Sequence, residues 1–430
     1  MTAVIHRAPV VLSPGSVALT DGAVAVAGDR ILAVGPADEV LAAAGPDAEV
    51  HEWDGALTPG LVNAHTHLQY SDMAAVGLAE HAGFEAWMSA FMELYPVPRD
   101  WGASAAAGAA LALRSGTTAV AEIVTDAAAG SAVHDAGLHG IAFWEVLGWT
   151  DRAWADGGES TVRAQLAALP TPPATGLSPH AIYSLDTGVI RDLARLAQQL
   201  GVRQHIHAAE SAWEDAYVRT GTGDLAERWR ANGRGEFALL RHGGVGTGVL
   251  RYLDDLGALT PTTHLAHGIY VDADDRALLR TRGVSVALCP RSNAVIGLDA
   301  PPVAAYLREG NAIAVGTDSL SSSPSLSPWQ DVAALYDIAR AQGYRDDDTH
   351  ARLFAAATAG GAHALGLDDT GVLRVGARAD LAVFPVAAST PREALAELVE
   401  AGPAEASLTV VGGRVRWATT IENERTTAHV

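Results

Sequence analysis

The segment TPGLVNAHTHL, residues 58–68, carries the pattern that decides the fold. Its apolar start is typical of a buried β-strand, and His65 and His67 stand where that strand should end. Because a strand repeats every two residues, both imidazoles project from one face and can bind one cation. Taken alone, the pair is equally compatible with a strand that carries two hydrogen-bonded histidines, so the rest of the chain must decide.

Size and charge limit the classes of function. The chain has 430 residues, of which 49% are hydrophobic, so it can bury a large core and form one large domain beside a smaller one. Its formal net charge is -21, from 29 basic and 50 acidic residues. Such a surface repels nucleic-acid phosphates and anionic membranes, which favours a small-molecule partner.

Cysteine content and hydropathy indicate the compartment. Cys289 is the single cysteine, so the chain can form no internal disulfide and offers no thiolate zinc site. The start lacks a secretory pattern, and no apolar run approaches the ~20 residues of a membrane span. We therefore expect a cytoplasmic protein, with Cys289 as a small core residue.

Short apolar runs alternate with amphipathic or alanine-rich stretches, which is the pattern of a parallel sheet with crossover helices. Eight such βα units predict an α/β fold in which the sheet closes into a (β/α)8 TIM barrel. The strands are predicted at 60–68, 119–124, 141–149, 175–181, 203–210, 262–269, 285–292 and 312–319, and helices at 189–201, 273–283, 301–310 and 329–343.

The two ends of the chain have a different pattern of apolar and polar residues. Residues 3–53 alternate apolar and polar positions around turns, and GVLRVGARADLAVFPV and LTVVGGRVRWA near the C-terminus do the same. Each end is too small for its own core, so we expect them to pack together. The predicted domains are a composite β-sandwich of residues 1–57 plus 370–430, and a catalytic barrel of residues 58–369.

Polar residues gather at the carboxyl ends of the predicted strands, which form the catalytic face of barrel enzymes. The first strand offers His65 and His67, and the eighth offers Asp318. The fifth and sixth strands add His205, His207, Glu210, His264 and His267. Three imidazoles and one carboxylate with room for water make a catalytic metal site rather than a structural one.

These motifs resemble the amidohydrolase superfamily, in its branch of purine and cytosine-type deaminases and triazine hydrolases. The resemblance covers essentially the whole chain. It is carried by the segments NAHTHL, SPHAIYS, HIHAAES, LAHG, CPRSN, GTDS and GARADLAVF, in this order along the chain. Ordered motifs at the ends of four strands are a strong signal, although any one of them would be weak.

The resemblance implies one divalent metal per chain, either zinc or iron, of which we expect zinc. Its implied ligands are His65, His67, His207 and Asp318. The fourth strand carries His180 and no bridging lysine, so a mononuclear site is expected. Such a metal lowers the pKa of bound water towards ~7. His205 is expected to pack or to support a ligand, and His264 to face away from the site.

The same resemblance implies the catalytic roles. Asp318 would accept the proton of the water molecule, and Glu210 would protonate the ring nitrogen next to the attacked carbon. His267 would position the attacking oxygen and stabilise the tetrahedral intermediate. His180 corresponds to a histidine that contacts substrate in relatives. Barrels of this family are often dimers, so we expect a homodimer.

Two long connections carry aromatic residues. After the first strand, Phe84, Trp87 and Met88 continue with Phe91 and Tyr95 along one face of a predicted helix. This face either packs on the barrel or forms a lid over a flat ring and an apolar tail. Residues 211–256 form a second insertion with further aromatic residues and arginines. Together they suggest a substrate larger than a bare base.

Finer features resemble the aminodeoxyfutalosine deaminases of the futalosine route to menaquinone. They are HTHLQYS, the GF-x-x-W element at 83–87, HAAES, CPRSN and GTDSLSSSPSL, which includes Ser319. The implied reaction is hydrolytic removal of the 6-amino group from an adenine nucleoside with a carboxyphenyl ketone tail. We expect Phe84, Trp87, His180 and Ser319 to contact substrate. Arg291 either meets the tail carboxylate or pairs with a neighbouring acid.

Three functions are consistent with these residues. The first is a purine-nucleoside deaminase, which includes deaminases of S-adenosylhomocysteine, methylthioadenosine or adenosine. The second is a triazine-type hydrolase that uses the same site for dechlorination or amide hydrolysis. The third is a non-catalytic binding barrel, which would require lost metal ligands, and none is lost here. Release of ammonia from adenine nucleosides separates the first two.

Overall fold

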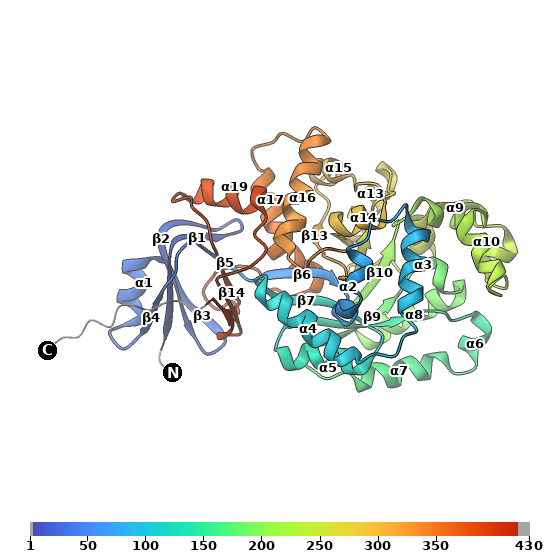
Figure 1. Ribbon diagram of the computed structural model, residues 1–430, viewed down its shortest axis with the longest axis horizontal. Coiled ribbons are helices and arrows are strands. Elements are labelled where there is room, and N and C mark those ends of the chain that lie inside the picture. Colours follow the sequence, from blue (N-terminus) through green and yellow to red (C-terminus); the bar gives the residue numbers. More distant parts are fainter. Residues whose placement is uncertain (1–2, 420–430) are drawn as a thin grey trace.

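The computed structural model describes residues 3–419 and contains a parallel barrel beside a mixed sheet (Figure 1). The eight barrel strands are neighbours in chain order, and a parallel bridge between Thr66 and Asp318 joins the two ends of the sheet. The predicted α/β barrel is confirmed. Its strands are β6 (Leu61–Thr66), β7 (Thr117–Val124), β8 (His139–Val146), β9 (Ala174–Pro179), β10 (Gln204–Ala208), β11 (Thr263–His267), β12 (Ser285–Leu288) and β13 (Ile313–Val315).

The predicted strands of the seventh and eighth units each run four residues beyond the ends of β12 and β13, and the difference in the seventh unit has a clear local cause. The sequence predicted a strand to residue 292, but β12 ends at Leu288 and helix α14 (Pro290–Ile296) follows at once. Pro290 has no backbone N–H and a fixed φ, so it suits the first position of a helix. This early helix places Ser292 and Asn293 on a helical turn next to the site.

Helices cover the outside of the barrel, and α8 shows how the sequence specifies them. Asp186 caps its first turn by accepting a hydrogen bond from the Thr187 N–H, Gly201 ends it with φ +64°, and Leu193 and Leu196 are buried. The barrel helices include α4 (Trp101–Arg114), α5 (Ala127–Ala136), α6 (Asp151–Ala155), α7 (Gly158–Ala168), α8 (Thr187–Leu200), α12 (Val249–Asp255), α13 (Ala273–Arg282), α15 (Val303–Glu309), α16 (Pro328–Ala341), α17 (Thr349–Ala355) and α18 (Gly361–Leu365).

Both ends of the chain build the second sheet, at the left in Figure 1. Its order is β16-β15-β14-β5-β1-β2-β3, and β4 also pairs with β1. One hydrophobic cluster joins Val11 and Val24 from the N-terminal strands to Leu381 and Leu408 from the C-terminal strands, so neither end forms this core alone. The strands are β1 (Val4–Ser13), β2 (Val17–Ala27), β3 (Arg30–Pro36), β4 (Glu49–Glu52), β5 (Ala56–Pro59), β14 (Leu381–Phe384), β15 (Leu408–Val411) and β16 (Arg414–Ala418); helices α1 (Ala37–Ala44) and α19 (Pro391–Ala401) lie beside them.

The chain passes from the terminal sheet to the barrel at Gly60, between β5 and β6. A Cβ atom at Gly60 would lie 2.2 Å from Thr118 side-chain atoms, so only glycine fits this crossing. We propose domain limits close to the predicted ones, with residues 58–369 as the barrel. Residues 1, 2 and 420–430 of the predicted sandwich lie outside the described part.

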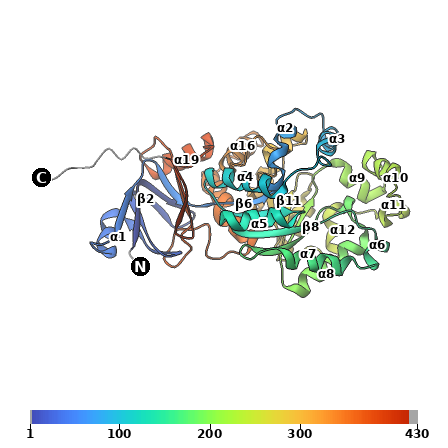
Figure 2. The same ribbon diagram turned by 60° about the horizontal axis from the view of Figure 1, so that its bottom comes forward.

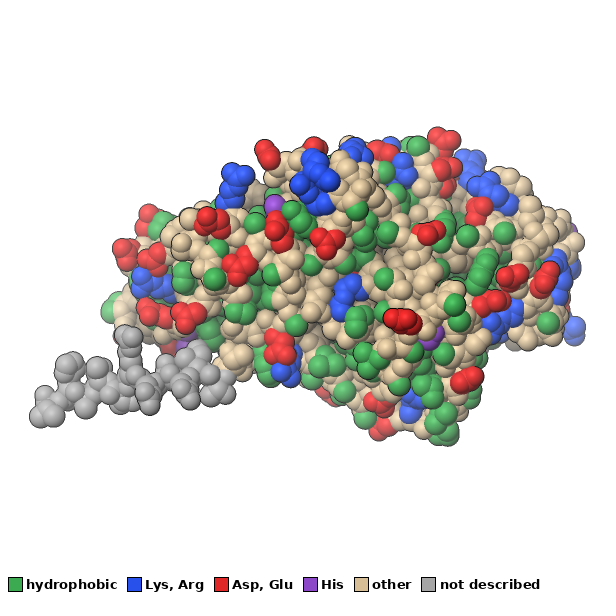
Figure 3. Space-filling model, turned by 45° about the horizontal axis from the view of Figure 1, so that its top comes forward, with side chains coloured by type: hydrophobic (Ala, Val, Ile, Leu, Met, Phe, Trp, Pro, Cys, Tyr) green, Lys and Arg blue, Asp and Glu red, His purple; other side chains and the backbone are tan. Residues whose placement is uncertain are grey.

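The two aromatic insertions lie over the carboxyl end of the barrel, away from the terminal sheet (Figure 2). They contain α2 (Ala74–Gly77) and α3 (Phe84–Leu94) after β6, and α9 (Ala212–Thr220), α10 (Asp224–Ala231) and α11 (Ala238–His242) after β10. Acidic side chains and arginines are interspersed on the face shown in Figure 3. Within residues 3–419, every helix is too short or too polar to cross a bilayer.

Candidate active site and metal centre

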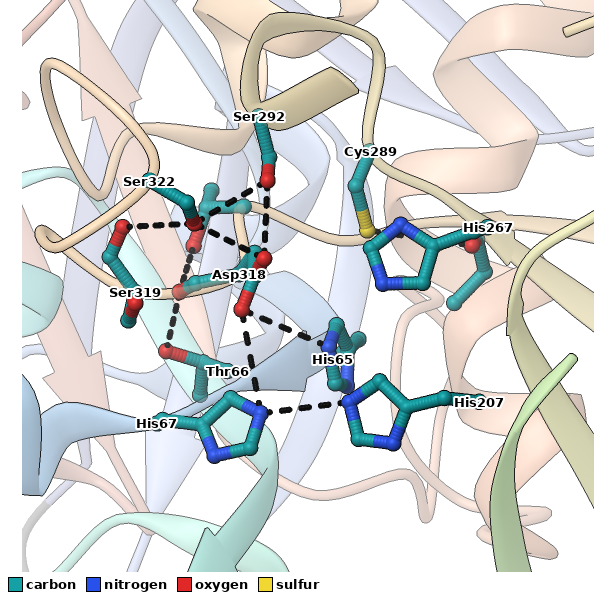
Figure 4. Close-up of polar contacts among 12 residues, drawn as sticks. His65, Thr66, His67, His207, His267, Cys289, Ser292, Asp318, Ser319 and Ser322 are labelled. Carbon is teal, nitrogen blue, oxygen red and sulfur yellow. Dashed lines mark hydrogen bonds and ion pairs between the residues drawn. The ribbon is translucent and has the colours of Figure 1, made fainter. Parts of the chain in front are cut away.

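The four predicted metal ligands converge at the carboxyl end of the barrel (Figure 4). His65 is the next-to-last residue of β6, and His67 follows directly after the strand. His207 lies on β10, and Asp318 follows β13. The Nε2 atoms of His67 and His207 are 3.4 Å apart. Oδ1 of Asp318 lies 3.5 Å from His65 Nε2 and 3.7 Å from His67 Nε2. Ligand atoms from three separate strands therefore face one point.

The backbone is strained where these strands end. Ala209, His267 and Asp318 have φ angles of 53°, 73° and 58°, in the left-handed region that residues with a Cβ seldom adopt. Hydrogen bonds hold two of these turns: the Asp318 N–H donates to the His65 carbonyl at 3.0 Å, and the Ile269 N–H donates to the Ala209 carbonyl at 2.9 Å. Strain of this kind clusters at active sites, because the surrounding structure must sustain it.

Two of the ligand imidazoles are oriented by contacts on their far side. Nδ1 of His65 lies 3.1 Å from His205 Nε2, and Nδ1 of His207 lies 3.1 Å from the His180 carbonyl oxygen. A carbonyl can only accept, so His207 carries its proton on Nδ1 and presents an unprotonated Nε2 to the cluster. His205 thus contacts a predicted ligand, while His264 instead contacts the Ala64 carbonyl at 3.1 Å.

Asp318 is held by two hydroxyl groups. Ser292 and Ser322 donate to its Oδ2 at 2.7 and 2.8 Å, which leaves Oδ1 to face the histidines. Burial alone would raise the pKa of this carboxyl, but the adjacent imidazoles of His65 and His67 hold the pKa well below its usual value. Asp318 is therefore an ionised carboxylate with one oxygen available as a ligand.

The residues fit a divalent metal. The Nε2 atom of His65 is buried and has no hydrogen-bond partner among the described residues, which suits an atom that would bind a cation. Burial lowers the pKa of the three histidines, that of His67 to about 3, so they are neutral, which is the form that binds metals. The sequence contains no lysine at all, so no lysine can bridge a second ion.

Glu210 lies beside this cluster. Only 5% of it is exposed, and its Oε1 is 3.6 Å from His267 Nε2. Burial raises the pKa of Glu210, which suits a group that must both hold and release a proton near neutral pH. The Glu210 N–H donates to Glu214 Oε2 at 2.9 Å, so Glu214 fixes the turn that carries it.

His267 has a positioning partner that the sequence analysis missed. Its Nδ1 lies 3.1 Å from Asn293 Oδ1, which leaves Nε2 directed at Glu210. Asn293 and Ser292 both belong to the CPRSN segment, in which the sequence predicts a substrate contact only for Arg291. Gly316 and Cys289 pack closely against His65, because a Cβ at Gly316 would lie 2.8 Å from both Cys289 Sγ and His65 Cβ. Cys289 is buried beside the site as a small packing residue.

A cavity of about 420 Å³ leads from these residues to the two insertions. Its volume suits a nucleoside-sized ligand. Phe84, Trp87, His180 and Ser319, which were predicted to contact substrate, all line it. Further lining residues are His67, Tyr70, Met88, Phe91, Met92, Tyr95, Thr125, Glu145, Leu147, Tyr183, Ser184, His207, Glu210, Arg228, Trp229, Asn232, Arg234, His267, Asp318 and Ser321.

Arg291 lies outside the set of residues that line this cavity. Its Nη1 donates to Ser325 Oγ at 2.8 Å and lies 3.7 Å from Asp331 Oδ2, so the structure shows the pairing with a neighbouring acid. Two other arginines, Arg228 and Arg234, line the cavity instead. The second insertion carries several arginines, but no periodicity identifies which of them turn inward.

Comparison with known proteins identifies the family. Residues 56–416 match the amidohydrolase family, and residues 22–44 match a bacterial imidazolonepropionase-like composite domain. The chain belongs to the amidohydrolase family. Among its relatives is a 5-methylthioadenosine/S-adenosylhomocysteine deaminase of Nitratidesulfovibrio vulgaris, 30% identical over 415 residues that cover 92% of this chain and 87% of that protein. The corresponding protein of Pelotomaculum thermopropionicum is 28% identical and covers 84% and 79%.

Solved structures of this family share the architecture. An adenosine deaminase from Xanthomonas campestris with bound zinc has a TM-score of 0.78 at 26% identity, covering 96% of this chain and 93% of that one. The aminofutalosine deaminase of Helicobacter pylori has a TM-score of 0.81 at 20% identity, covering 96% and 99%, and this likeness shows the fold alone. The predicted superfamily is confirmed, and the chain is an amidohydrolase-family hydrolase of the deaminase branch, acting on C–N bonds.

We expect Asn293→Ala to lower kcat by about 10- to 100-fold while the metal is retained. Loss of the Oδ1 acceptor frees the His267 ring to rotate, and outer contacts of this kind typically have effects of that size. Steady-state kinetics and elemental analysis measure both quantities. Asn311→Ala is the matched control, since Asn311 is a buried asparagine that contacts Arg276 and Arg280 away from the cavity. Equal loss of kcat in both variants would contradict the assigned role.

Proposed function

We propose that this chain hydrolytically deaminates an adenine nucleoside with a large, anionic 5′ substituent, and that its substrate is aminodeoxyfutalosine. The observation that carries the proposal is the cavity, whose lining includes Glu210, three of the predicted metal ligands (His67, His207 and Asp318), an aromatic wall and two arginines. A bare base or adenosine would leave much of this lining unused. Binding energy from a remote tail can be expressed as a higher kcat/KM.

The reacting end supplies the groups for hydrolysis of a ring C–N bond. A divalent metal, with zinc expected, held by His65, His67, His207 and Asp318 would make water acidic enough to act near neutral pH. Asp318 would accept a proton of the attacking water through Oδ1. Glu210 would give a proton to N1 of the purine as oxygen adds to C6, and His267 would hold that oxygen through Nε2.

Proton balance follows from the same residues. The oxygen of water remains on C6 as a carbonyl, and the C6–N bond breaks. The amino nitrogen leaves as ammonia, which carries away a proton that Asp318 took from water. Glu210 recovers its own proton from the water hydroxyl as the carbonyl forms, so the protein ends in its starting state. Burial of Glu210 and of His267 keeps bulk water from competing for these protons.

The part of the cavity lining that the two insertions contribute suits a flat, anionic tail. The rings of Phe84, Trp87 and Phe91 pack in sequence along α3 in a tilted arrangement, with centroids 5.7 and 5.5 Å apart, and Trp87 Nε1 donates to the Ser321 carbonyl at 2.8 Å. Arg234 lies 4.7 Å over the Trp229 ring. Within residues 3–419, neither Arg234 nor Arg228 forms an ion pair, so both guanidinium groups are available for a carboxylate.

A second candidate class is supported by the relatives at about 30% identity, which are 5-methylthioadenosine/S-adenosylhomocysteine deaminases. S-adenosylhomocysteine also ends in a carboxylate, whereas methylthioadenosine is neutral. The aromatic wall favours the carboxyphenyl tail of aminodeoxyfutalosine over an aliphatic amino acid. Assignment to the futalosine route to menaquinone depends on this preference.

The test is a comparison of kcat/KM, followed by the loss of adenine absorbance and by ammonia release. The panel contains aminodeoxyfutalosine, S-adenosylhomocysteine, methylthioadenosine and adenosine. We expect the highest kcat/KM for aminodeoxyfutalosine. Preference for adenosine or methylthioadenosine would reject the anionic tail but keep the deaminase chemistry, and turnover of a chlorotriazine without any nucleoside would favour the triazine-hydrolase alternative.

We expect Arg228→Ala combined with Arg234→Ala to lower kcat/KM for the two carboxylate-bearing nucleosides by about 10- to 100-fold, the size expected when hydrogen bonds to a charged group are lost. Turnover of methylthioadenosine should change little, because it has no carboxylate. Arg230→Ala is the matched control, since Arg230 lies on α10 with Arg228 but donates to the Gly221 carbonyl. An equal loss for all nucleosides would mean that the two arginines stabilise the insertion only.

A further inference from the structure

Glu145 is a buried acid that none of the assigned roles uses. It is the next-to-last residue of β8, only 6% of it is exposed, and it lines the cavity. Its Oε1 has no hydrogen-bond partner in the described part of the chain. A buried polar group without a partner is costly, so such a group in a binding cavity points to a ligand that supplies the missing contact.

The two histidines next to Glu145, His180 and His207, both have their Nδ1 atoms engaged in other contacts. Glu145 shares a group of potential ligand atoms, all within 4.8 Å of one another, with His180 and His207. His180 Nδ1 is bonded to Ser184 Oγ at 2.8 Å, and His207 Nδ1 to the His180 carbonyl. The remaining Nε2 of His207 faces the predicted metal, so a second cation at Glu145 would lack a complete ligand set.

The position of Glu145 relative to Glu210 indicates which part of a nucleoside it would meet. Glu210 lies next to His267, whereas Glu145 lies next to His180, and His207 neighbours both histidines: ring centroids are 5.6 Å from His207 to His267 and 4.9 Å from His207 to His180. In adenine the ribose-bearing edge is opposite N1. If N1 faces Glu210, the ribose is directed away from it, toward the Glu145 side of the cavity.

The chemistry of the substrate leaves few groups that could satisfy Glu145. Apart from the 6-amino group at the reacting carbon, an adenine nucleoside has hydrogen-bond donors only in its ribose hydroxyls. A carboxyl group can meet two adjacent hydroxyls, because it has two oxygens in one plane. We propose that Glu145 binds the 2′,3′-diol of the ribose and so makes the enzyme selective for ribosides. This inference rests on the proposed deamination of a nucleoside.

The test combines removal of the carboxyl with removal of the hydroxyls. Wild type, Glu145→Leu and Glu145→Gln are each assayed with methylthioadenosine and with its 2′,3′-dideoxy analogue. We expect wild type to lose about 10- to 100-fold in kcat/KM when the hydroxyls are absent, and Glu145→Leu to lose as much on the intact ribose. Glu145→Leu should then show almost no further loss on the dideoxy analogue, since the two changes remove one interaction. Glu145→Gln should lie between, because an amide still bonds hydroxyls.

Controls separate this inference from the function on which it rests. Glu93→Gln, an exposed glutamate on α3 beside the cavity, should behave as wild type. Elemental analysis of Glu145→Gln should give the wild-type metal content. Loss of the metal in Glu145→Gln would overturn the diol assignment. So would losses of kcat/KM that multiply when Glu145→Leu is combined with the dideoxy analogue, because the two changes would then remove separate interactions. No turnover of any nucleoside by wild type would instead overturn the proposed function.

Discussion

His207→Ala should lose both the metal and deaminase activity. In the wild type, the Nε2 atom of His207 faces the other ligands from β10, and its Nδ1 is fixed by the His180 carbonyl at 3.1 Å. His205, two residues earlier on β10, is engaged with His65 and so is not free to take its place. Since a bound metal lowers the pKa of water from 15.7 to about 7, we expect turnover to fall by more than about 10³-fold.

Elemental analysis of purified protein measures the metal independently of activity. Wild type should contain one metal per chain, and the variant almost none. His363→Ala is the matched control, since His363 is exposed on α18. Metal retained by His207→Ala would place the ligand elsewhere, and two metals per fully active chain would contradict a mononuclear site.

Glu210→Gln should keep the metal and bind nucleoside but turn over at least about 10²-fold more slowly, the size typical of general acid–base catalysis. The amide keeps the size of the side chain but cannot carry a proton between water and N1. The raised pKa of the buried Glu210 carboxyl is consistent with such an exchange. Steady-state kinetics should show the loss in kcat, with a much smaller change in KM.

Glu159→Gln provides a comparison at the surface, where Glu159 pairs with Arg163 four residues along α7. That variant should have wild-type kinetics. A Glu210→Gln enzyme with near wild-type kcat would assign the proton transfer to another residue. Loss of metal in Glu210→Gln would make Glu210 a ligand, although its Oε1 is directed at His267.

The sequence was sufficient to predict the barrel and the types of residue expected to bind the metal. Apolar runs of strand length, separated by helical stretches, encode their own secondary structure through local periodicity, and β6 to β13 follow these runs. Parallel strands place their carboxyl ends at one rim, so His65, His207 and Asp318 were predicted to meet although they are far apart in the chain. The seventh unit deviated because Pro290 starts a helix early.

Only the tertiary structure determined which side chains meet across loops. Arg291 pairs with Asp331 forty residues later, whereas Arg228 and Arg234 turn toward the cavity. Asn293 supports His267, and Glu145 is left without a partner for Oε1 among the described residues. Strand periodicity fixes which face a residue occupies, but a hydrogen bond requires two atoms at about 3 Å. That distance depends on loop paths and helix placement, which no local pattern in the sequence encodes.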